Sequence, residues 1–153
     1  MLWLLNVVFT VLDLLGFYIS FEAIIIPMFF VIGIWGSRAE KVRASYYFFL
    51  YTAAGSILLL LSILFLSYTY GTTDYLVLIK QQIETKWQYY IFITFFLSFA
   101  AKIPLVPFHI WLPQAHTEGN VAGSVLLGGV LIKLGSYGII RFAVGLTPMA
   151  CEY

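Results

Sequence analysis

Charged residues are scarce in this sequence. Asp, Glu, Lys and Arg make up 10% of its 153 residues, whereas an average soluble domain contains about 25%. Hydrophobic residues account for 62% of the chain, and aromatic residues for 19%. The net charge of +1 offers no basic surface for nucleic acid. Together with the mean hydropathy of +0.97, this composition indicates a protein that lies in a lipid bilayer.

Cysteine is limited to Cys151, which allows no disulfide within the chain and forms no metal-ligand cluster. We expect it to be an unreactive thiol near the end of the last span. The N-terminal stretch lacks the basic region of a signal peptide, and its apolar run continues beyond the usual signal core. An Arg-rich transit leader is also missing. We therefore expect insertion by the spans themselves, which for a mitochondrial protein fits synthesis inside the organelle.

Long apolar stretches predict an all-α integral membrane protein. About 20 apolar residues are needed to cross roughly 30 Å of hydrocarbon at 1.5 Å per residue. Four stretches reach this length: 14–35, 46–68, 89–108 and 121–142. Residues 1–12 are apolar but too short to cross alone, so they form at most a partial fifth span. We interpret residues 1–153 as a single transmembrane module.

The basic residues predict an orientation. The densest cationic cluster comprises Arg38, Lys41 and Arg43. Because such clusters stay on the cytoplasmic or matrix side, we place residues 37–43 inside, the loop at 69–88 outside, and the loop at 109–120 inside. Within the outer loop, residues 74–87 fit either a short interfacial helix or a packed loop.

Three ionisable residues lie inside the expected spans: Glu22, Lys102 and Lys133. Counted along their helices, they lie roughly 12, 20 and 18 Å deep. A charge at the centre of a membrane helix costs at least about 2.5–3.5 kcal/mol. One interpretation is structural, with Glu22 neutralising a lysine and joining two helices. We favour a proton path, because intramembrane acids and amines that pair with one another typically mark such paths.

We hypothesise that these residues form a proton relay. Burial disfavours the charged form of a group, and an opposite charge nearby favours it. A Glu22–Lys102 pair that opens and closes can thus load and release a proton, with Glu22 as modulator, Lys102 as carrier and Lys133 as the next station. His109 and His116, which titrate near neutrality, either connect the lysines to water or make structural hydrogen bonds.

Pro104 and Pro107 follow Lys102 closely and predict a break in the third span. Each removes a backbone donor and disturbs the preceding turn. A carbonyl freed at membrane depth is tolerated only where it is buried in protein or lines a wet cavity. We therefore expect Lys102 beside irregular, hydrated backbone, although prolines also kink ordinary spans.

Glycines are concentrated in the fourth span, at Gly123, Gly128, Gly129, Gly135 and Gly138. Small residues let membrane helices approach closely, so we expect this span to be central in a bundle. The glycines do not have the spacing of a phosphate-binding loop around Lys133.

Four stretches resemble one known family: "SFEAIIIPMFFVIGIWGSR", "YYFFLYTAAGSILLLL", "FAAKIPLVPFHIWLPQAH" and "AGSVLLGGVLIKLGSYGIIRF". In this order they are similar to the antiporter-like membrane subunits of the proton-pumping NADH:quinone oxidoreductase, respiratory complex I, and in particular to its chain 4. The resemblance runs almost from end to end of the sequence.

The resemblance implies a role for each candidate residue. Glu22 matches the family's glutamate of the fifth span, Lys102 the lysine of the broken seventh span, and Lys133 the lysine of the eighth span. By this likeness Glu22 and Lys102 form the coupling ion pair, and Lys133 leads on to an exit half. His109 and His116 also match family positions.

The resemblance further implies a proton-translocating piece of an enzyme, NADH:ubiquinone reductase. Such chains hold no cofactor or metal of their own. NADH, flavin, iron–sulfur clusters and ubiquinone are expected in other subunits of the complex. The expected location is the mitochondrial inner membrane, with a bacterial plasma membrane as the alternative.

The sequence departs from the family in two respects. Gly119-Asn120 stands where the family usually has Ala-Pro, so we expect a looser start of the fourth span. Only the fifth to eighth spans are represented, so we expect one piece of a split subunit, completed by partner chains and set among other membrane-arm subunits and lipid. Two alternatives stay open: a chain of a multisubunit Na⁺/H⁺ antiporter, and a non-pumping structural bundle.

Overall fold

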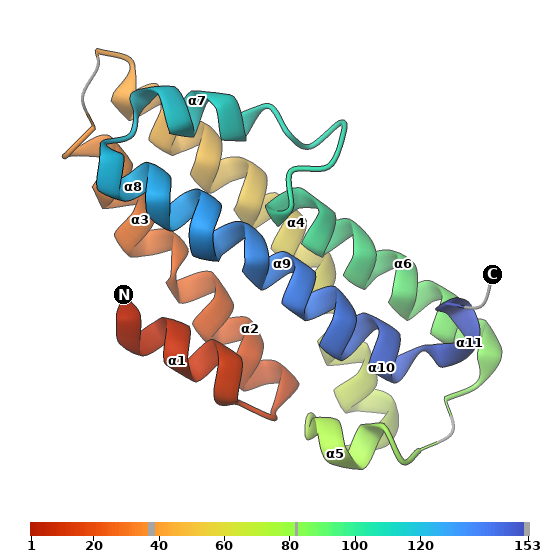
Figure 1. The fold of residues 1–153 in the computed structure, drawn as a ribbon. Helices are drawn as coiled ribbons and strands as arrows, with labels where there is room; N and C mark the ends of the chain where they lie inside the picture. The colour runs from red at the N-terminus through yellow and green to blue at the C-terminus, as the bar shows by residue number, and fades with distance from the viewer. Residues whose placement is uncertain (37–38, 82, 152–153) are drawn as a thin grey trace.

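The computed structural model describes residues 1–36, 39–81 and 83–151, and every regular element in this part of the chain is a helix (Figure 1). The α-helices are α1 (Leu2–Thr10), α2 (Leu14–Ala23), α3 (Ile25–Gly33), α4 (Lys41–Tyr70), α5 (Tyr75–Leu78), α6 (Thr85–Lys102), α7 (Trp111–Glu118), α8 (Val121–Leu126), α9 (Ile132–Gly138), α10 (Val144–Leu146) and α11 (Pro148–Cys151). Two π-helical turns, η1 (Leu127–Leu131) and η2 (Ile139–Ala143), join α8, α9 and α10 into one rod. The prediction of an all-α fold is confirmed.

Among the described residues, three helical stretches are long and apolar enough to cross a membrane: Leu14–Gly33, Lys41–Tyr70 and Val121–Leu146. They correspond to the first, second and fourth predicted spans. α4 begins at Lys41 rather than at residue 46, because no helix breaker separates the basic turn from the apolar run. Its 30 residues extend about 45 Å, which exceeds a hydrocarbon core of about 30 Å.

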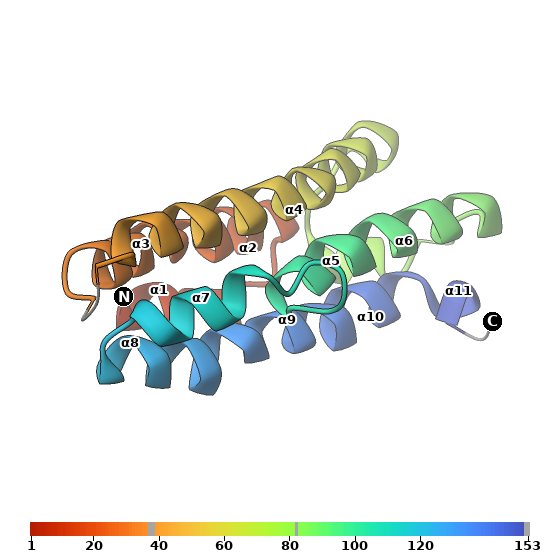
Figure 2. The ribbon, with the colours of Figure 1, turned by 90° about the horizontal axis from the view of Figure 1, so that it is seen from above.

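The third predicted span, 89–108, differs from the structure. α6 ends at Lys102, and after an irregular segment at 103–110 the chain forms α7. α6 packs along the second half of α4, and α7 along its first half (Figures 1 and 2). The predicted inner loop at 109–120 is therefore mostly helical. Trp111 and Ala115, one turn apart, are both buried, and this apolar face holds α7 against α4.

Small and hydroxylic residues bring α4 and α6 close together. A Cβ at Gly55 would lie 2.5 Å from the Cβ of Ala101, so only glycine permits this approach. One end of the contact carries a hydrogen bond of 2.5 Å between the hydroxyls of Ser62 and Thr94. This is the packing expected between helices in a membrane, where small residues and polar contacts replace the hydrophobic drive.

Asp13 fixes the start of the first span. Its Oδ2 accepts a hydrogen bond of 2.7 Å from the backbone N–H of Gly16, which caps α2, and its other oxygen accepts one from the Thr73 hydroxyl. A short antiparallel bridge to Asp74 completes the link. α1 is thereby folded back beside α2 as a separate short helix (Figure 1), and it does not extend the span.

The predicted outer loop combines both structures that we considered for residues 74–87. Tyr75–Leu78 forms a single helical turn, α5, whose Leu78 is buried. The Tyr75 hydroxyl donates a hydrogen bond of 2.9 Å to the carbonyl of Arg141, and burial raises the pKa of this phenol. The remainder of the stretch leads into α6 at Thr85.

The rod from α8 to α10 packs on one side only. Gly135 and Gly138 face α6, where an added Cβ would meet Ile103 and Phe99 respectively. On another side Lys133 and Ile140 are exposed. Within the described residues, the close approach expected of the glycines is therefore found at Gly135 and Gly138, and Gly129 lies open.

The cationic cluster that set the predicted orientation is described in part. Arg38 lies outside the described residues. Lys41 donates a hydrogen bond of 2.8 Å to the carbonyl of Ile34, and Arg43 pairs with Glu40 at 3.7 Å. Both cations lie at the start of α4, beyond the apolar part of its helix. The orientation itself stays a prediction.

Candidate functional site

Lys102 is the last residue of α6, and its side chain is buried. The helix ends there because Pro104 cannot donate the backbone hydrogen bond that would continue it. The carbonyl groups left over find other donors. The Ala100 carbonyl accepts from the N–H of Leu105 at 3.0 Å, and the Ala101 carbonyl accepts from the indole N–H of Trp111 at 2.9 Å. The predicted break is confirmed, and the helix ends six residues before the end of the predicted span.

The first span is interrupted as well. α2 ends at Ala23 and α3 begins at Ile25, so Glu22 lies in the last turn of a helix. Pro27 accounts for the interruption, because it lacks the N–H that would reach the carbonyl of Ala23. Carbonyl groups in the last turn of a helix lack partners within that helix. Sequence analysis missed this second break, although Pro27 was the available signal.

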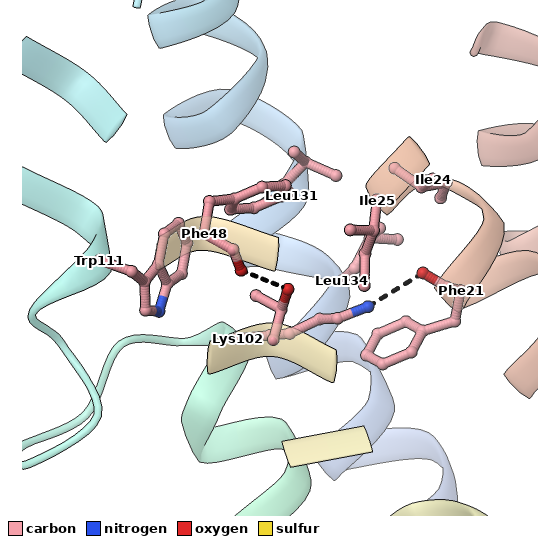
Figure 3. A pocket seen from close by; sticks show the side chains of 9 residues that line it. Phe21, Ile24, Ile25, Phe48, Lys102, Trp111, Leu131 and Leu134 are labelled. Atoms are coloured by element: carbon pink, nitrogen blue, oxygen red, sulfur yellow. Dashed lines mark hydrogen bonds between the residues drawn. The ribbon is translucent and has the colours of Figure 1, made fainter. Parts of the chain in front are cut away.

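The two interruptions face each other (Figure 3). Lys102 Nζ donates a hydrogen bond of 2.9 Å to the carbonyl oxygen of Phe21 and lies 3.5 Å from Glu22 Oε1. The same nitrogen lies 3.2 Å from the centroid of the Phe21 ring. Glu22 Oε1 is buried and accepts no hydrogen bond in the described structure. The structure thus brings Glu22 and Lys102 together. Phe21, which sequence analysis did not single out, also contacts the ammonium.

A small cavity adjoins the lysine. Its volume is about 20 Å³, and a water molecule needs roughly 10–15 Å³ measured this way. Figure 3 shows Trp111 and Phe48 on one side of it and Phe21 and Ile25 on the other. The lining is Phe21, Ile24, Ile25, Phe48, Thr52, Lys102, Trp111, Leu131 and Leu134. The cavity therefore has room for about one water beside a charged group in otherwise apolar surroundings.

A polar cleft opens at the far end of α7. Its volume is about 300 Å³, and it is lined by Glu40, Arg43, Ala44, Gln114, Thr117 and Glu118. One oxygen of Glu118 and one of Gln114 are buried without a hydrogen-bond partner in the described structure. Elsewhere along the contact of α4 with α7, the ring centroids of Phe48 and Trp111 are 5.3 Å apart. Phe48 and Trp111 also line the cavity beside Lys102.

The other predicted site residues stand apart from the pair. Lys133 is exposed and makes no hydrogen bond or ion pair with any described residue, whereas its neighbour Leu134 lines the lysine cavity. His109 is exposed in the irregular segment. His116 lies in α7, and its carbonyl accepts a long hydrogen bond of 3.4 Å from the Ser124 hydroxyl. The structure therefore does not join these three side chains into a chain with Lys102.

These features define a class of protein. Two interrupted helices in an apolar helical bundle bring a buried amine and a partly buried carboxylate together. Broken helices whose free backbone groups contact charges are the usual construction of ion-translocating membrane proteins. The chain belongs to the NADH:quinone oxidoreductase/Mrp antiporter transmembrane family, whose model matches residues 12–153.

Comparison with individual proteins supports this assignment. NADH-ubiquinone oxidoreductase chain 4 of Metridium senile is 59% identical over 150 residues, which is 98% of this chain and 30% of the relative. Its counterpart in Arabidopsis thaliana is 50% identical over 148 residues, or 97% and 30% of the two chains. Among solved structures, a chain of respiratory complex I from Thermus thermophilus with bound NADH matches with a TM-score of 0.85 and 34% identity, over 95% of this chain and 31% of that one. The chain thus spans about 30% of the length of the curated relatives that it matches.

Proposed function

We propose that this chain is part of the proton-translocating chain 4 of NADH:ubiquinone oxidoreductase. In this role Lys102 carries the proton, and Glu22 controls its release. The observation that carries the proposal is the 3.5 Å contact between Lys102 Nζ and Glu22 Oε1 at two facing helix breaks. The named relatives support the choice of complex over the general family.

The pair can act as a proton switch because the charged form of each residue favours the charged form of the other. While the carboxylate stays close, the buried ammonium is favoured; when the carboxylate moves away, burial favours the neutral amine. Separation of the pair therefore releases a proton from Lys102. The adjoining cavity, with room for about one water, is the first place that this proton can go.

Lys133 is the next station in this proposal. It lies on the rod just after the π-helical turn η1, and π-helical turns are frequent at functional sites. Its exposed side chain needs a cover in the membrane, which the remaining spans of the subunit supply. His109 and His116 lie on the α7 side of Lys102, where they connect the site to water.

The setting follows from the same proposal. Other membrane-arm subunits, and the chain or chains that supply the missing spans, are the partners. The redox cofactors, namely NADH, flavin, iron–sulfur clusters and ubiquinone, belong to other subunits. The membrane is the mitochondrial inner membrane, as the eukaryotic relatives suggest.

The test compares two lysine variants in the assembled complex. Lys102→Met removes the carrier amine, and Lys80→Met, on an exposed loop residue, is the matched control. In sealed membrane vesicles we expect Lys102→Met to lose most NADH-driven proton translocation while assembly persists. The control should pump normally. Full pumping by Lys102→Met would refute the relay and favour a structural bundle.

The family description also names Mrp antiporters, so the same vesicles should separate the two activities. A proton gradient driven by NADH without sodium supports the respiratory role. If this chain instead migrates with a complex that lacks NADH oxidation and exchanges sodium for protons, the antiporter role replaces it. A native gel with mass spectrometry of the band gives this answer directly.

A further inference from the structure

The backbone carbonyl of Phe21 contacts the Lys102 ammonium more closely than the Glu22 carboxylate does, and the Phe21 ring also faces the cation. The nitrogen lies 2.9 Å from the Phe21 carbonyl oxygen and 3.2 Å from the centre of the Phe21 ring. The carboxylate oxygen of Glu22 is 3.5 Å away. Charge-assisted hydrogen bonds between ammonium and carboxylate groups measure about 2.7–2.9 Å. The carboxylate contact is therefore loose, and a single neighbouring residue holds the cation on two sides.

Both Phe21 contacts attract a positive charge for physical reasons. The carbonyl belongs to the last turn of α2, where carbonyl groups lack helical partners and carry the negative end of the helix dipole. The face of an aromatic ring is negative, so a cation above it is attracted. Phe21 and Lys102 are both buried, and such interactions strengthen where water is excluded.

We propose that Phe21 is a positioning residue that holds the Lys102 ammonium in place when the Glu22 contact opens. This inference rests on the proposed proton relay and adds a third component to it. With the carboxylate withdrawn, the carbonyl and the ring keep the nitrogen beside the 20 Å³ cavity. Burial still disfavours the ammonium and drives the proton off toward that cavity, while the Phe21 carbonyl and ring only fix where the nitrogen lies.

A purely structural role for Phe21 predicts something different. The ring packs edge-to-face with Phe99 at 5.8 Å and stacks with Phe17 at 5.1 Å, so its removal also disturbs the core. Phe17 provides the matched control. It is equally buried and belongs to the same ring cluster, but no cation lies over its ring among the described residues.

The first experiment compares Phe21→Leu and Phe17→Leu in the assembled complex. Leucine keeps an apolar side chain and removes the ring. We expect Phe21→Leu to lower the rate of NADH-driven proton translocation about two- to thirtyfold, the range expected for loss of one cation–ring contact. Phe17→Leu should pump normally at an equal level of assembled complex. Equal pumping by the two variants overturns the inference.

A second measurement separates charge attraction from shape. Phenylalanines with increasing numbers of fluorine atoms, introduced at position 21, weaken the negative ring face while the ring keeps its shape. The pumping rate should fall stepwise with fluorine number at position 21 and stay constant in the same series at position 17. A flat series at both positions overturns the inference even where Phe21→Leu fails to assemble.

The outcome for Lys102→Met keeps the two proposals distinguishable. If Lys102→Met pumps normally, the proton relay itself is wrong. If Lys102→Met is inactive but the fluorine series is flat, the relay stands and only the role of Phe21 is lost.

Discussion

Lys102 Nζ and Glu22 Oε1 lie 3.5 Å apart, and each residue belongs to the last turn of its own interrupted helix. If the two helices continued without interruption, the backbone carbonyl groups next to these residues would be occupied by hydrogen bonds within the helices. The helix breaks therefore supply backbone carbonyl groups that accept from side chains, as the Phe21 carbonyl does from Lys102 and the Ala101 carbonyl from Trp111. Four predictions follow from this and neighbouring contacts.

The ion pair predicts an unusual pattern of stability. Removal of one partner of a buried pair costs about 3–5 kcal/mol, because it leaves an uncompensated charge, whereas removal of both costs much less. Glu22→Gln should lower the thermal midpoint of the solubilised complex, and Glu22→Gln with Lys102→Met should recover most of that loss. An exposed-residue control, Glu84→Gln, should change nothing. A double variant less stable than both single variants contradicts this account.

Trp111 should support the helix break through its indole N–H. Trp111→Phe keeps a ring against Phe48 but removes the hydrogen bond to the Ala101 carbonyl, and such a bond contributes about 0.5–1.5 kcal/mol. We expect a lower thermal midpoint and faster proteolysis within residues 103–110. Trp87→Phe is the control, since Trp87 packs against the rings of Phe65 and Tyr90 and its indole N–H donates no hydrogen bond among the described residues. Equal behaviour of the two variants would show that the indole bond is dispensable.

The side of the rod that packs against α6 should not tolerate an added methyl group. In Gly138→Ala the new Cβ would collide with the buried ring of Phe99, and such overpacking typically costs 1–3 kcal/mol. At Gly129 no atom lies within 4 Å of an added Cβ in the described structure. Gly138→Ala should therefore reduce the yield of assembled complex. Gly129→Ala tests the exposed side of the rod in the same assay. A reduced yield of that variant would reveal a partner that packs against this side.

The face that carries Lys133 should be covered by protein in the complete assembly. A lysine that faces lipid at the centre of a span costs at least about 2.5–3.5 kcal/mol, and Ile140, two turns on, is 72% exposed. A photo-crosslinking residue at position 140 should therefore capture another segment of the subunit or a neighbouring chain. Capture of lipid alone would contradict a covered face and remove Lys133 from the relay.

Much of the architecture could be predicted from the sequence because hydrophobicity and charge act locally. The long apolar runs predicted the helices of the first, second and fourth spans, and Pro104 predicted the break beside Lys102. The same local reasoning failed at residues 109–120. There the polar residues suggested a loop. The helix forms because Trp111 and Ala115 are buried against α4, and this contact joins residues far apart in the sequence.

The candidate site was likewise predictable from the sequence only in part. The sequence alone determined which residues carry charge into the membrane and where prolines interrupt the helices, since both properties belong to single residues and their neighbours. Only the tertiary structure decided that Lys102 meets Glu22, that Phe21 lies closest to the ammonium, and that Lys133 points elsewhere. Those relationships depend on how α2 and α6 pack across the bundle, and close packing of side chains distant in sequence leaves no local signal in the order of the residues.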